Sequence, residues 1–423
     1  MRKHDLKDEA VYERERAEQR LWQAARMGGI SRRRFLQLIG AGAGFVALST
    51  FPGGFLTACA NRTTTEEEAA SEDKVVKPTP SDYFYDYDGN LEMRWEAMAD
   101  EGYYTPNWLF FVRNHTSTPR DIDVSSWGLH IEGSGVENPT EFTYDDLLGM
   151  EEVSVTKAIE CAGNGRSFFD LFQGRKVGGT QWKLGAIGVA EWTGVRLREL
   201  LERAKVKSTA VDVMPSGLDS EVEDKGHVRR PIPIEKAMDD ETLLVYGMNG
   251  EDLPQDHGYP ARVLVPGWVG VANIKWVGSI EVSESPLYSN WNTNDYVMIG
   301  DDYPNRPVLT TQNLKSAFEL PWDGQIETGR RQLSGRSWSG EAEIERVEVS
   351  MDGGSTWQVA ELSDRNTSKA WVQWFVDWDT QPSRYGLQAR ATDRAGNTQP
   401  SSVPFNEKGY LYNAVVEHPI TVA

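Results

Sequence analysis

The sequence predicts an α+β protein with two folded parts: a mixed α+β domain over residues 82–305 and a β-sandwich of immunoglobulin type over residues 306–423. In the first part, strand and short-helix patterns are mixed without the regular strand–helix–strand repeat of a parallel sheet. In the second part, short alternating segments are separated by tight-turn sequences. The chain of 423 residues is long enough for each part to bury a core of its own.

Composition and charge exclude several classes of protein. A net charge of −20 argues against general nucleic-acid binding, which needs a basic surface. Two cysteines, Cys59 and Cys161, are too few for a disulfide scaffold, a four-thiolate zinc site or a four-thiolate iron–sulfur cluster. The absence of a Cys-x-x-Cys-His motif excludes covalent c-type haem. No dinucleotide-binding glycine motif or Walker loop supports nicotinamide or ATP binding.

The first 58 residues predict an export signal. Residues 1–34 are charged, and Ser31-Arg32-Arg33-Arg34-Phe35-Leu36 then leads into a mildly apolar stretch that ends at Leu56. Two arginines before Phe-Leu resemble a bacterial twin-arginine signal, which directs folded proteins to the periplasm. The alternative is an ordinary membrane anchor, because about 20 apolar residues can span a bilayer.

The end of this stretch predicts a lipid anchor. Leu56-Thr57-Ala58-Cys59 resembles a bacterial lipoprotein cleavage box, so we expect Cys59 to be the first mature residue and to carry the acyl chains that hold the protein to the membrane. The alternative is cleavage at another position. Residues 59–81 are rich in Thr, Glu, Ala and Pro and lack periodicity, which predicts a disordered tether.

The mixed domain is expected to contain short helices, strands and long loops rich in Gly and Pro. Helices are expected at Tyr144–Gly149, Val195–Ala204 and Ile234–Met238. Strands are expected at Leu129–Glu132, Val153–Ile159, Ala210–Met214, Arg262–Val265 and Ile274–Val282.

The second domain shows the pattern of about seven short strands. Glu345–Met351 alternates, turns through Asp352-Gly353-Gly354 and continues as Thr356–Leu362, which predicts a hairpin. Further strands are expected at Lys369–Trp378 and Tyr385–Thr392. A sandwich of this type does not by itself imply a function.

A candidate site follows the strand expected at Val153–Ile159. The chain there reads Glu160-Cys161-Ala162-Gly163-Asn164-Gly165-Arg166, so a thiol lies at a strand end in a loop of small residues that leaves room for a large ligand. Arg166 would favour the thiolate, which is a soft metal ligand or a nucleophile. A buried structural cysteine is the alternative.

Three other segments carry cations and glycines. They are Phe110-Phe111-Val112-Arg113-Asn114-His115, Asp256–Arg262 and Gly267–Trp276. Each alone is also explained by solvated charges or a satisfied loop histidine. Together they offer the cations, backbone N–H groups and close approach that an anionic cofactor needs.

These pieces together resemble the sulfite oxidase family of molybdenum enzymes, from about Tyr103 to the C-terminus. The twin-arginine signal points to the exported bacterial sulfite dehydrogenases within that family. Besides the Cys161 loop and the three cationic segments, the resemblance rests on Gln181-Trp182 with Gly185-Ala186-Ile187, Ser216-Gly217-Leu218-Asp219, Asn294-Asp295-Tyr296 and Val349–Trp357.

The resemblance implies a molybdenum–molybdopterin cofactor with Cys161 as the single protein ligand of the metal. It implies a substrate pocket lined by Arg113, Arg166, Trp182 and Tyr296, in which sulfite is oxidised to sulfate, and a homodimer formed by the second domain. The pterin and its phosphate would be bound by Phe111, Val112, Arg113, Asn114, His115, Asp219, His257, Arg262, Asn273, Ile274 and Lys275.

We see no haem or flavin segment, so electrons are expected to pass to a periplasmic c-type cytochrome or to a haem-bearing partner subunit. Two positions depart from the animal enzymes: Gly165 stands where they carry the first of two arginines, and Lys408 replaces a substrate-contacting arginine. Other readings are a sulfoxide reductase or nitrate reductase of the same fold and a non-enzymatic surface lipoprotein. Arg113, Arg166 and residues 306–423 count against the sulfoxide reductase.

Overall fold

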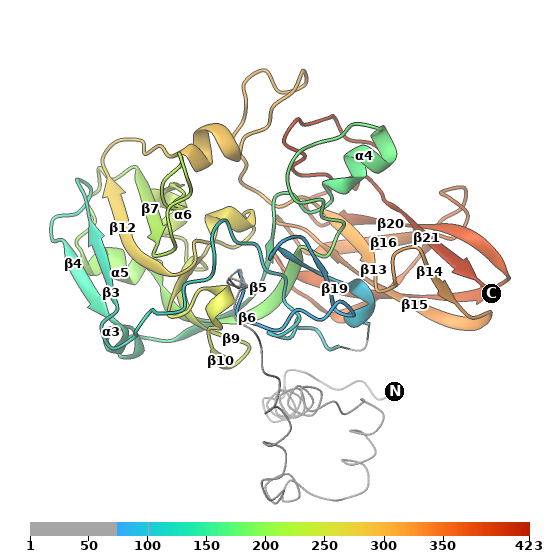
Figure 1. Ribbon diagram of the computed structural model, residues 1–423, viewed down its shortest axis with the longest axis horizontal. Helices are drawn as coiled ribbons and strands as arrows, with labels where there is room; N and C mark the ends of the chain where they lie inside the picture. The colour runs from blue at the N-terminus through green and yellow to red at the C-terminus, as the bar shows by residue number, and fades with distance from the viewer. Residues whose placement is uncertain (1–73, 100) are drawn as a thin grey trace, which may run out of the picture. The chain divides into compact units, whose positions relative to one another are not determined.

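The computed structural model describes residues 74–99 and 101–423. The predicted signal peptide, Cys59 and most of the predicted tether therefore lie outside the described residues. Both predicted folded parts belong to one compact unit, Glu72–Ala423. In Figure 1, β5 and β6 lie between the β3–β12–β7 sheet and the orange and red strands of the second domain.

The mixed domain is built around two sheets. The first is antiparallel in the order β10-β9-β6-β5, and β11 pairs with the part of β9 that β10 does not cover. Its β5 leads directly into the Cys161 loop. The strand bounds are β5 Val153–Glu160, β6 Ile187–Arg196, β9 Leu243–Met248, β10 Glu251–Asp252 and β11 Arg262–Leu264.

The second sheet of the mixed domain has the order β4-β3-β12-β7-β8, with β12 parallel to β3 and antiparallel to β7. A separate antiparallel pair, β1 and β2, precedes it in the chain. The bounds are β1 Phe84–Asp86, β2 Leu91–Met93, β3 Gly128–Glu132, β4 Thr140–Thr143, β7 Asp212–Gly217, β8 Ile232–Pro233 and β12 Val277–Ser283.

Helices in the described part of the chain are short. Thr143 caps α3 in a capping box with Asp146, since each side chain bonds the other residue's backbone N–H. The helix bounds are α3 Tyr144–Leu148, α4 Ser167–Gln173, α5 Leu197–Arg203 and α6 Ile234–Ala237, with 3-10 turns η1 Trp95–Ala97, η2 Gln255–His257 and η3 Gly270–Ala272 and a π turn η4 Trp291–Asp295.

The second domain is a sandwich of two sheets, ordered β13-β15-β19-β18 and β14-β21-β20-β16-β17. Side chains from both sheets, including Val349, Trp374 and Leu387, form one buried core. The strand bounds are β13 Lys315–Phe318, β14 Gly324–Ile326, β15 Gly329–Trp338, β16 Ile344–Ser350, β17 Gln358–Val359, β18 Glu361–Asn366, β19 Trp371–Thr380, β20 Ser383–Asp393 and β21 Glu417–Val422.

The α+β class, the sandwich and the three expected helices are confirmed. The hairpin expected at residues 345–362 is only partly right. Its first arm pairs with Gln358–Val359 as predicted, but the chain then changes sheets at Ala360, and β18 pairs with β19 in the opposite sheet. The sandwich therefore has nine strands in residues 306–423 instead of about seven.

The described chain begins before the expected boundary at residue 82. We call residues 74–77 the N-terminal strap. Its Val76 and Lys77 backbone N–H groups donate to the Asp256 carboxylate over 2.9 and 2.8 Å, and the Lys74 carbonyl accepts from Thr118 N over 2.9 Å. Part of the segment expected to be a disordered tether is thus bonded to the loop that precedes His257.

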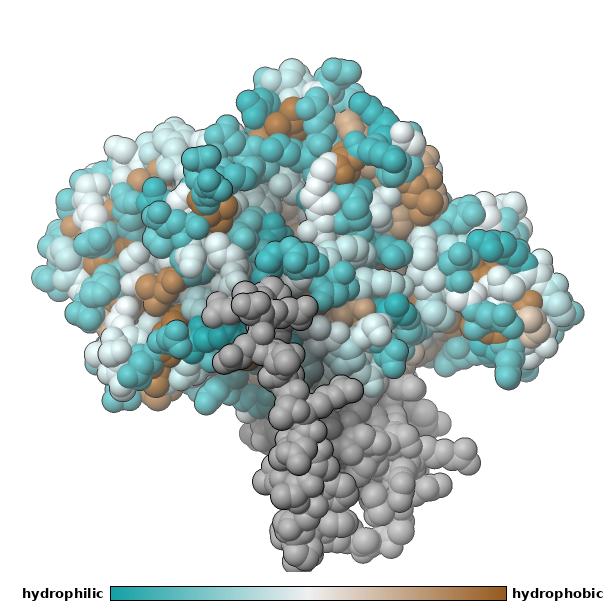
Figure 2. Space-filling model, in the orientation of Figure 1, coloured by the Kyte–Doolittle hydropathy of each residue, from teal (hydrophilic) through white to brown (hydrophobic). Residues whose placement is uncertain are grey.

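The face of the molecule in Figure 2 is largely hydrophilic, with apolar residues scattered among polar ones. Across residues 74–99 and 101–423, we find no helix with the length and apolar character needed to cross a membrane.

Candidate molybdopterin and substrate site

The Cys161 loop is held by backbone bonds to a neighbouring segment. Cys161 is buried and follows the last residue of β5. Its N–H donates to the Ala186 carbonyl over 2.9 Å, and its own carbonyl accepts from Asn164 N over 2.9 Å. These bonds fix the turn, so the direction of the Cys161 thiol is set by the backbone.

Gly165 has a conformational reason to be glycine. Its φ of +98° is one that residues with a side chain rarely adopt, and a Cβ there would lie 3.1 Å from the Tyr412 Cβ. An arginine at this position, which the resemblance to the animal enzymes would lead one to expect, does not fit this backbone without a shift.

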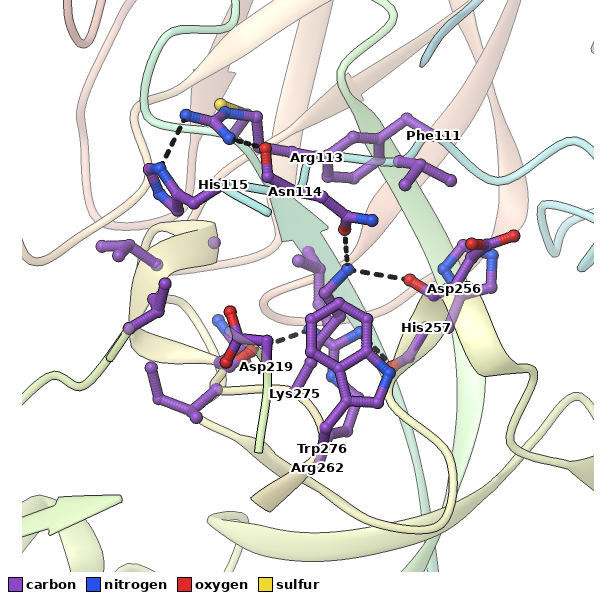
Figure 3. Close-up of a pocket in the computed structure, with 18 of the residues that line it drawn as sticks. Phe111, Arg113, Asn114, His115, Asp219, Asp256, His257, Arg262, Lys275 and Trp276 are labelled. Atoms are coloured by element: carbon purple, nitrogen blue, oxygen red, sulfur yellow. Dashed lines mark hydrogen bonds between the residues drawn. The ribbon is translucent and has the colours of Figure 1, made fainter. Parts of the chain in front are cut away.

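The Cys161 thiol opens on a cavity with about 750 Å³ of empty space, part of it open to solvent. Figure 3 shows how the labelled residues converge on it from separate loops. Of the residues expected from the sequence, those that line the cavity are Phe111, Val112, Arg113, Asn114, His115, Cys161, Asp219, His257, Arg262, Asn273, Ile274, Lys275 and Tyr296.

Strand pairing brings these distant segments together. Leu91 of β2 exchanges two backbone hydrogen bonds with Val112, over 2.9 and 3.0 Å, which places residues 111–115 at the cavity. Val263 N of β11 donates to the Ile274 carbonyl over 2.9 Å, so the loops around His257 and Lys275 lie side by side. Asp219 follows the end of β7, and Tyr296 follows η4.

Positive charge is concentrated and buried on one side of the cavity. Burial lowers the pKa of Arg262 to about 9. Burial, reinforced by the charge of Arg262, lowers the pKa of Lys275 well below its usual value. Lys275 Nζ donates to the Asn114 side-chain oxygen and, over 2.8 Å, to the Asp256 carbonyl, as Figure 3 shows. A bound anion would offset this repulsion, because it restores a counter-charge to buried cations.

Two buried nitrogens on the same side lack a partner within the described residues: His257 Nε2 and Arg262 Nε. The other Arg262 nitrogens donate to the His257 carbonyl over 2.8 Å and to the Asn273 carbonyl over 3.0 Å. An unsatisfied buried polar group costs about 1–3 kcal/mol, so a ligand that bonds these nitrogens is stabilised here. The cations, the unpartnered nitrogens and the nearby thiol fit an anionic pterin cofactor with a phosphate and a metal.

On the other side of the cavity, Arg113, His115 and Tyr296 form a hydrogen-bonded chain. Arg113 donates to His115 Nδ1 over 3.1 Å, and His115 Nε2 lies 3.1 Å from the Tyr296 hydroxyl. Arginine can only donate, so His115 Nδ1 must be the acceptor and the neutral ring carries its proton on Nε2. Burial and the nearby Arg113 hold the pKa of His115 well below its usual value, which keeps the ring neutral.

Because His115 donates to the Tyr296 oxygen, the Tyr296 hydroxyl proton is free to point elsewhere, and Tyr296 lines the cavity. Burial raises the pKa of Tyr296 to about 12, so the hydroxyl stays protonated at neutral pH. Its ring stacks on Tyr410, with centroids 5.3 Å apart and planes 15° apart. Tyr296 is thus a fixed hydrogen-bond donor at the cavity.

Arg166, expected to line the substrate pocket, lies behind this stack and does not line the cavity. Its Nε donates to the Lys408 carbonyl over 3.2 Å and one terminal nitrogen donates to the Thr180 carbonyl over 2.9 Å. Its guanidinium lies 5.2 Å from the Tyr410 ring centroid. In this arrangement Arg166 supports the pocket wall through Tyr410.

Trp182, also expected to line the pocket, is fully buried and is not one of the cavity residues. It packs in a hydrophobic cluster with Cys161, Phe110 and Phe111, and its ring meets the edge of Tyr87 at 5.5 Å between centroids. The structure therefore places Trp182 in the core beside the Cys161 loop.

Lys408 points away from the cavity as well. Its ammonium lies 3.7 Å from Asp295 Oδ1, and Lys225 binds the other oxygen of the same carboxylate over 2.9 Å. The Lys408 ammonium is therefore paired with the Asp295 carboxylate, and only the Lys408 backbone carbonyl reaches Arg166.

Sequence reasoning missed three parts of the site. Asp256 lines the cavity and anchors the N-terminal strap, and Trp276 lies with its ring under the Lys275 ammonium, 4.1 Å from the ring centroid. Both lie in the segments Asp256–Arg262 and Gly267–Trp276, which the sequence singles out for their cations. Tyr410 lies in the second domain, and no local pattern connects it with Tyr296.

Comparison with known proteins supports the same assignment. The family model described as "Oxidoreductase molybdopterin binding domain" matches residues 115–291, and the one described as "Mo-co oxidoreductase dimerisation domain" matches residues 306–422. Human mitochondrial sulfite oxidase is 36% identical over 340 residues, which cover 75% of this chain and 61% of the human enzyme. The chain thus spans about three fifths of that relative.

Two further relatives match over more of their own length. Chicken (Gallus gallus) sulfite oxidase is 34% identical over 351 residues, covering 77% of this chain and 74% of the chicken enzyme. The crystal structure of the sulfane dehydrogenase SoxCD from Paracoccus pantotrophus superimposes with a TM-score of 0.68 at 28% identity, covering 87% of this chain and 92% of that one. On this sequence and structural agreement, the chain belongs to the sulfite oxidase family of molybdopterin-binding oxidoreductases.

Proposed function

We propose that this protein oxidises sulfite to sulfate at a molybdenum–molybdopterin cofactor and passes the electrons to an external acceptor. The observation that carries the proposal is the cavity itself, which joins the Cys161 thiol to buried cations and unpartnered nitrogens in one space. In this proposal Cys161 holds the metal, while Arg262, Lys275 and His257 bind the pterin and its phosphate. When bound, the cofactor supplies oxygen-atom transfer and accepts two electrons.

The chain's own residues bind the substrate and handle protons. Oxidation of sulfite to sulfate takes up one water and releases two protons with the two electrons. Arg113 is a permanently charged donor for the oxyanion, and Tyr296 adds a hydrogen bond from its protonated hydroxyl. Because His115 Nε2 already carries a proton and Nδ1 accepts from Arg113, the chain from Arg113 to Tyr296 holds the Tyr296 hydroxyl as a donor towards the oxyanion.

The test is analysis of purified, matured protein for molybdenum and pterin, together with sulfite-dependent reduction of a c-type cytochrome. We expect one molybdenum per chain and reduction that depends on sulfite. Protein that contains no molybdenum after maturation, or loaded protein that does not oxidise sulfite, would contradict the proposal.

A second candidate substrate is sulfane sulfur, as in the name of the solved relative. The favouring observations are the match over 92% of that chain and the reduced positive charge near the pocket, where Gly165 and the paired Lys408 stand. Comparing kcat/KM for sulfite, thiosulfate and a protein-bound persulfide distinguishes the two. A nitrate or sulfoxide reductase would instead consume electrons from a reduced dye.

For location and assembly, we propose twin-arginine export, a lipid tether on Cys59 and a homodimer formed through the second domain. The dimerisation-domain match supports the last of these. Mass spectrometry of the mature N-terminus tests the lipid, Arg32→Lys with Arg33→Lys tests the export route, and analytical ultracentrifugation tests the dimer. We further propose a c-type cytochrome or a haem-bearing subunit as the electron acceptor, which the cytochrome assay tests directly.

A further inference from the structure

The second domain forms hydrogen bonds to the chain on both sides of Cys161. Ala158 N, in β5, donates to the Lys369 carbonyl over 2.8 Å, and the Ala162 carbonyl accepts from Leu411 N over 2.9 Å. These bonds lie on either side of Cys161 along the chain. The loop of the expected metal ligand is therefore supported from outside its own domain.

Between these two bonds lies a buried ion pair across the same boundary. Lys315 Nζ, at the start of β13, is 2.7 Å from Glu160 Oε1, and both side chains are only 2% exposed. The same ammonium donates to the Asn164 carbonyl over 2.8 Å. A single cation of the second domain thus bonds the residue before Cys161 and a residue three positions after it.

The two residues that Lys315 bonds are also joined to each other and to the segment behind the loop. The Asn164 amide donates to Glu160 Oε1 over 2.9 Å, and its oxygen accepts from Ala186 N over 3.0 Å. Ala186 in turn receives the hydrogen bond from Cys161 N. The turn that carries Cys161 is closed on both sides, and Lys315 supplies the one cation in this set of bonds.

We propose that Lys315 of the second domain is a positioning residue for Cys161, holding the loop in the geometry in which the thiol meets the metal. Neither Lys315 nor Glu160 lines the cavity, so the effect is exerted through the loop. Groups of this kind, one step removed from a metal ligand, orient the ligand and strengthen metal binding. The inference rests on Cys161 being the metal ligand, as proposed above, and does not depend on which substrate is oxidised.

The decisive variant is Glu160→Gln with Lys315→Met. Replacing Lys315 alone leaves a buried carboxylate without a partner, which can unfold the protein for reasons unrelated to the loop. The double variant leaves no bare charge, and the new Gln oxygen can still accept from Asn164. Only the bonds of the Lys315 ammonium, to Glu160 and to the Asn164 carbonyl, are lost, while the backbone bonds with Lys369 and Leu411 remain.

The matched control is Arg336→Met with Glu319→Gln. Arg336 Nε and Glu319 Oε1 form a second fully buried pair, 2.6 Å apart, within the second domain. The other hydrogen bonds of Arg336 go to carbonyls at residues 101–103, none of them in the Cys161 loop. This control variant therefore removes the same kind of buried ion pair at a place outside the Cys161 loop.

The first readout is the alkylation rate of Cys161 in cofactor-free protein, followed on the Cys161 peptide by mass spectrometry with iodoacetamide as the probe. The second is molybdenum per chain after maturation. All proteins are compared at the same interval below their own unfolding midpoints, so that lost stability alone does not register as a loosened loop.

We expect the Glu160/Lys315 variant to be alkylated at Cys161 faster than wild type and to contain less molybdenum per chain after maturation, while the Arg336/Glu319 control matches wild type in both. Equal behaviour of the two variants, or wild-type alkylation and molybdenum in the Glu160/Lys315 variant, overturns the positioning role. Neither readout uses sulfite, so failure of this inference and failure of the proposed activity are separate results.

Discussion

The two sides of the cavity are built differently. The side with Arg262 and Lys275 comes entirely from the mixed domain. The opposite side, where Tyr296 lies, is completed from behind by Tyr410 and the Lys408 carbonyl of the second domain. In the proposed function, the cofactor is therefore bound by one domain, whereas the substrate position is shaped by both.

The largest expected effect is on the thiol that both sides share. We expect Cys161→Ser to reduce bound molybdenum and sulfite oxidation to background, because a serine hydroxyl is neither soft nor ionised at neutral pH. Elemental analysis and a cytochrome reduction assay measure both. Retention of full activity with bound molybdenum would show that the metal does not depend on this residue.

The next effect tests the substrate side. We expect Tyr296→Phe to lower kcat about 100-fold, because a fixed hydrogen-bond donor to developing charge contributes about that much. Molybdenum content should be unchanged. Since burial raises the pKa of Tyr296 to about 12, the hydroxyl is protonated throughout the neutral range, so the loss should be similar from pH 6 to pH 9.

The control is Tyr410→Phe, which keeps the ring stacked on Tyr296 and removes only the outer hydroxyl. It should leave kcat nearly unchanged. If both phenylalanine variants lose the same activity, the role assigned to the Tyr296 hydroxyl is wrong, and the stack itself is what matters.

A smaller effect tests the cofactor side. We expect Arg262→Met to weaken pterin retention about 10-fold or more, because a hydrogen bond to a charged group contributes about 1.5–3 kcal/mol. Pterin released per chain on denaturation measures the loss. Arg230→Met is the control, since Arg230 is also buried, also has an unpartnered Nε and does not line the cavity. Equal pterin loss in both variants would remove Arg262 from the binding site.

The smallest effect is expected outside the cavity. Lys408→Ala should change KM for sulfite less than about fivefold, because a partly exposed ion pair contributes about 0–1 kcal/mol. Steady-state kinetics at constant ionic strength check this. A rise in KM of more than tenfold would mean that the Lys408 ammonium leaves Asp295 and reaches the substrate.

The cofactor side was predictable because its residues follow recognisable signals. Arg262, His257 and Lys275 each lie in a segment that combines cations with glycines, and the structure brings all three to one cavity. Strand β6 was missed because it is buried on both faces and contains two glycines, so it shows no alternation.

The substrate side was less predictable because the second domain changes what the side chains face. Arg166 and Trp182 stand close to Cys161 in the expected segments, yet one is bonded to backbone carbonyls and the other is enclosed in the core. Lys408 has a carboxylate partner that is 113 positions away in sequence (408 − 295 = 113). Contacts at such separations leave no local pattern.

The hydrogen bond from Leu411 N to the Ala162 carbonyl has a consequence for the timing of synthesis. Leu411 follows Ala162 by 249 residues (411 − 162 = 249), which a ribosome needs roughly 10 to 50 seconds to add at about 5–20 residues per second. During that interval the nascent chain already carries Cys161 without the support that completes its loop. The proposed metal site at Cys161 thus depends on the whole translated chain, and loading of the cofactor is expected to follow release from the ribosome.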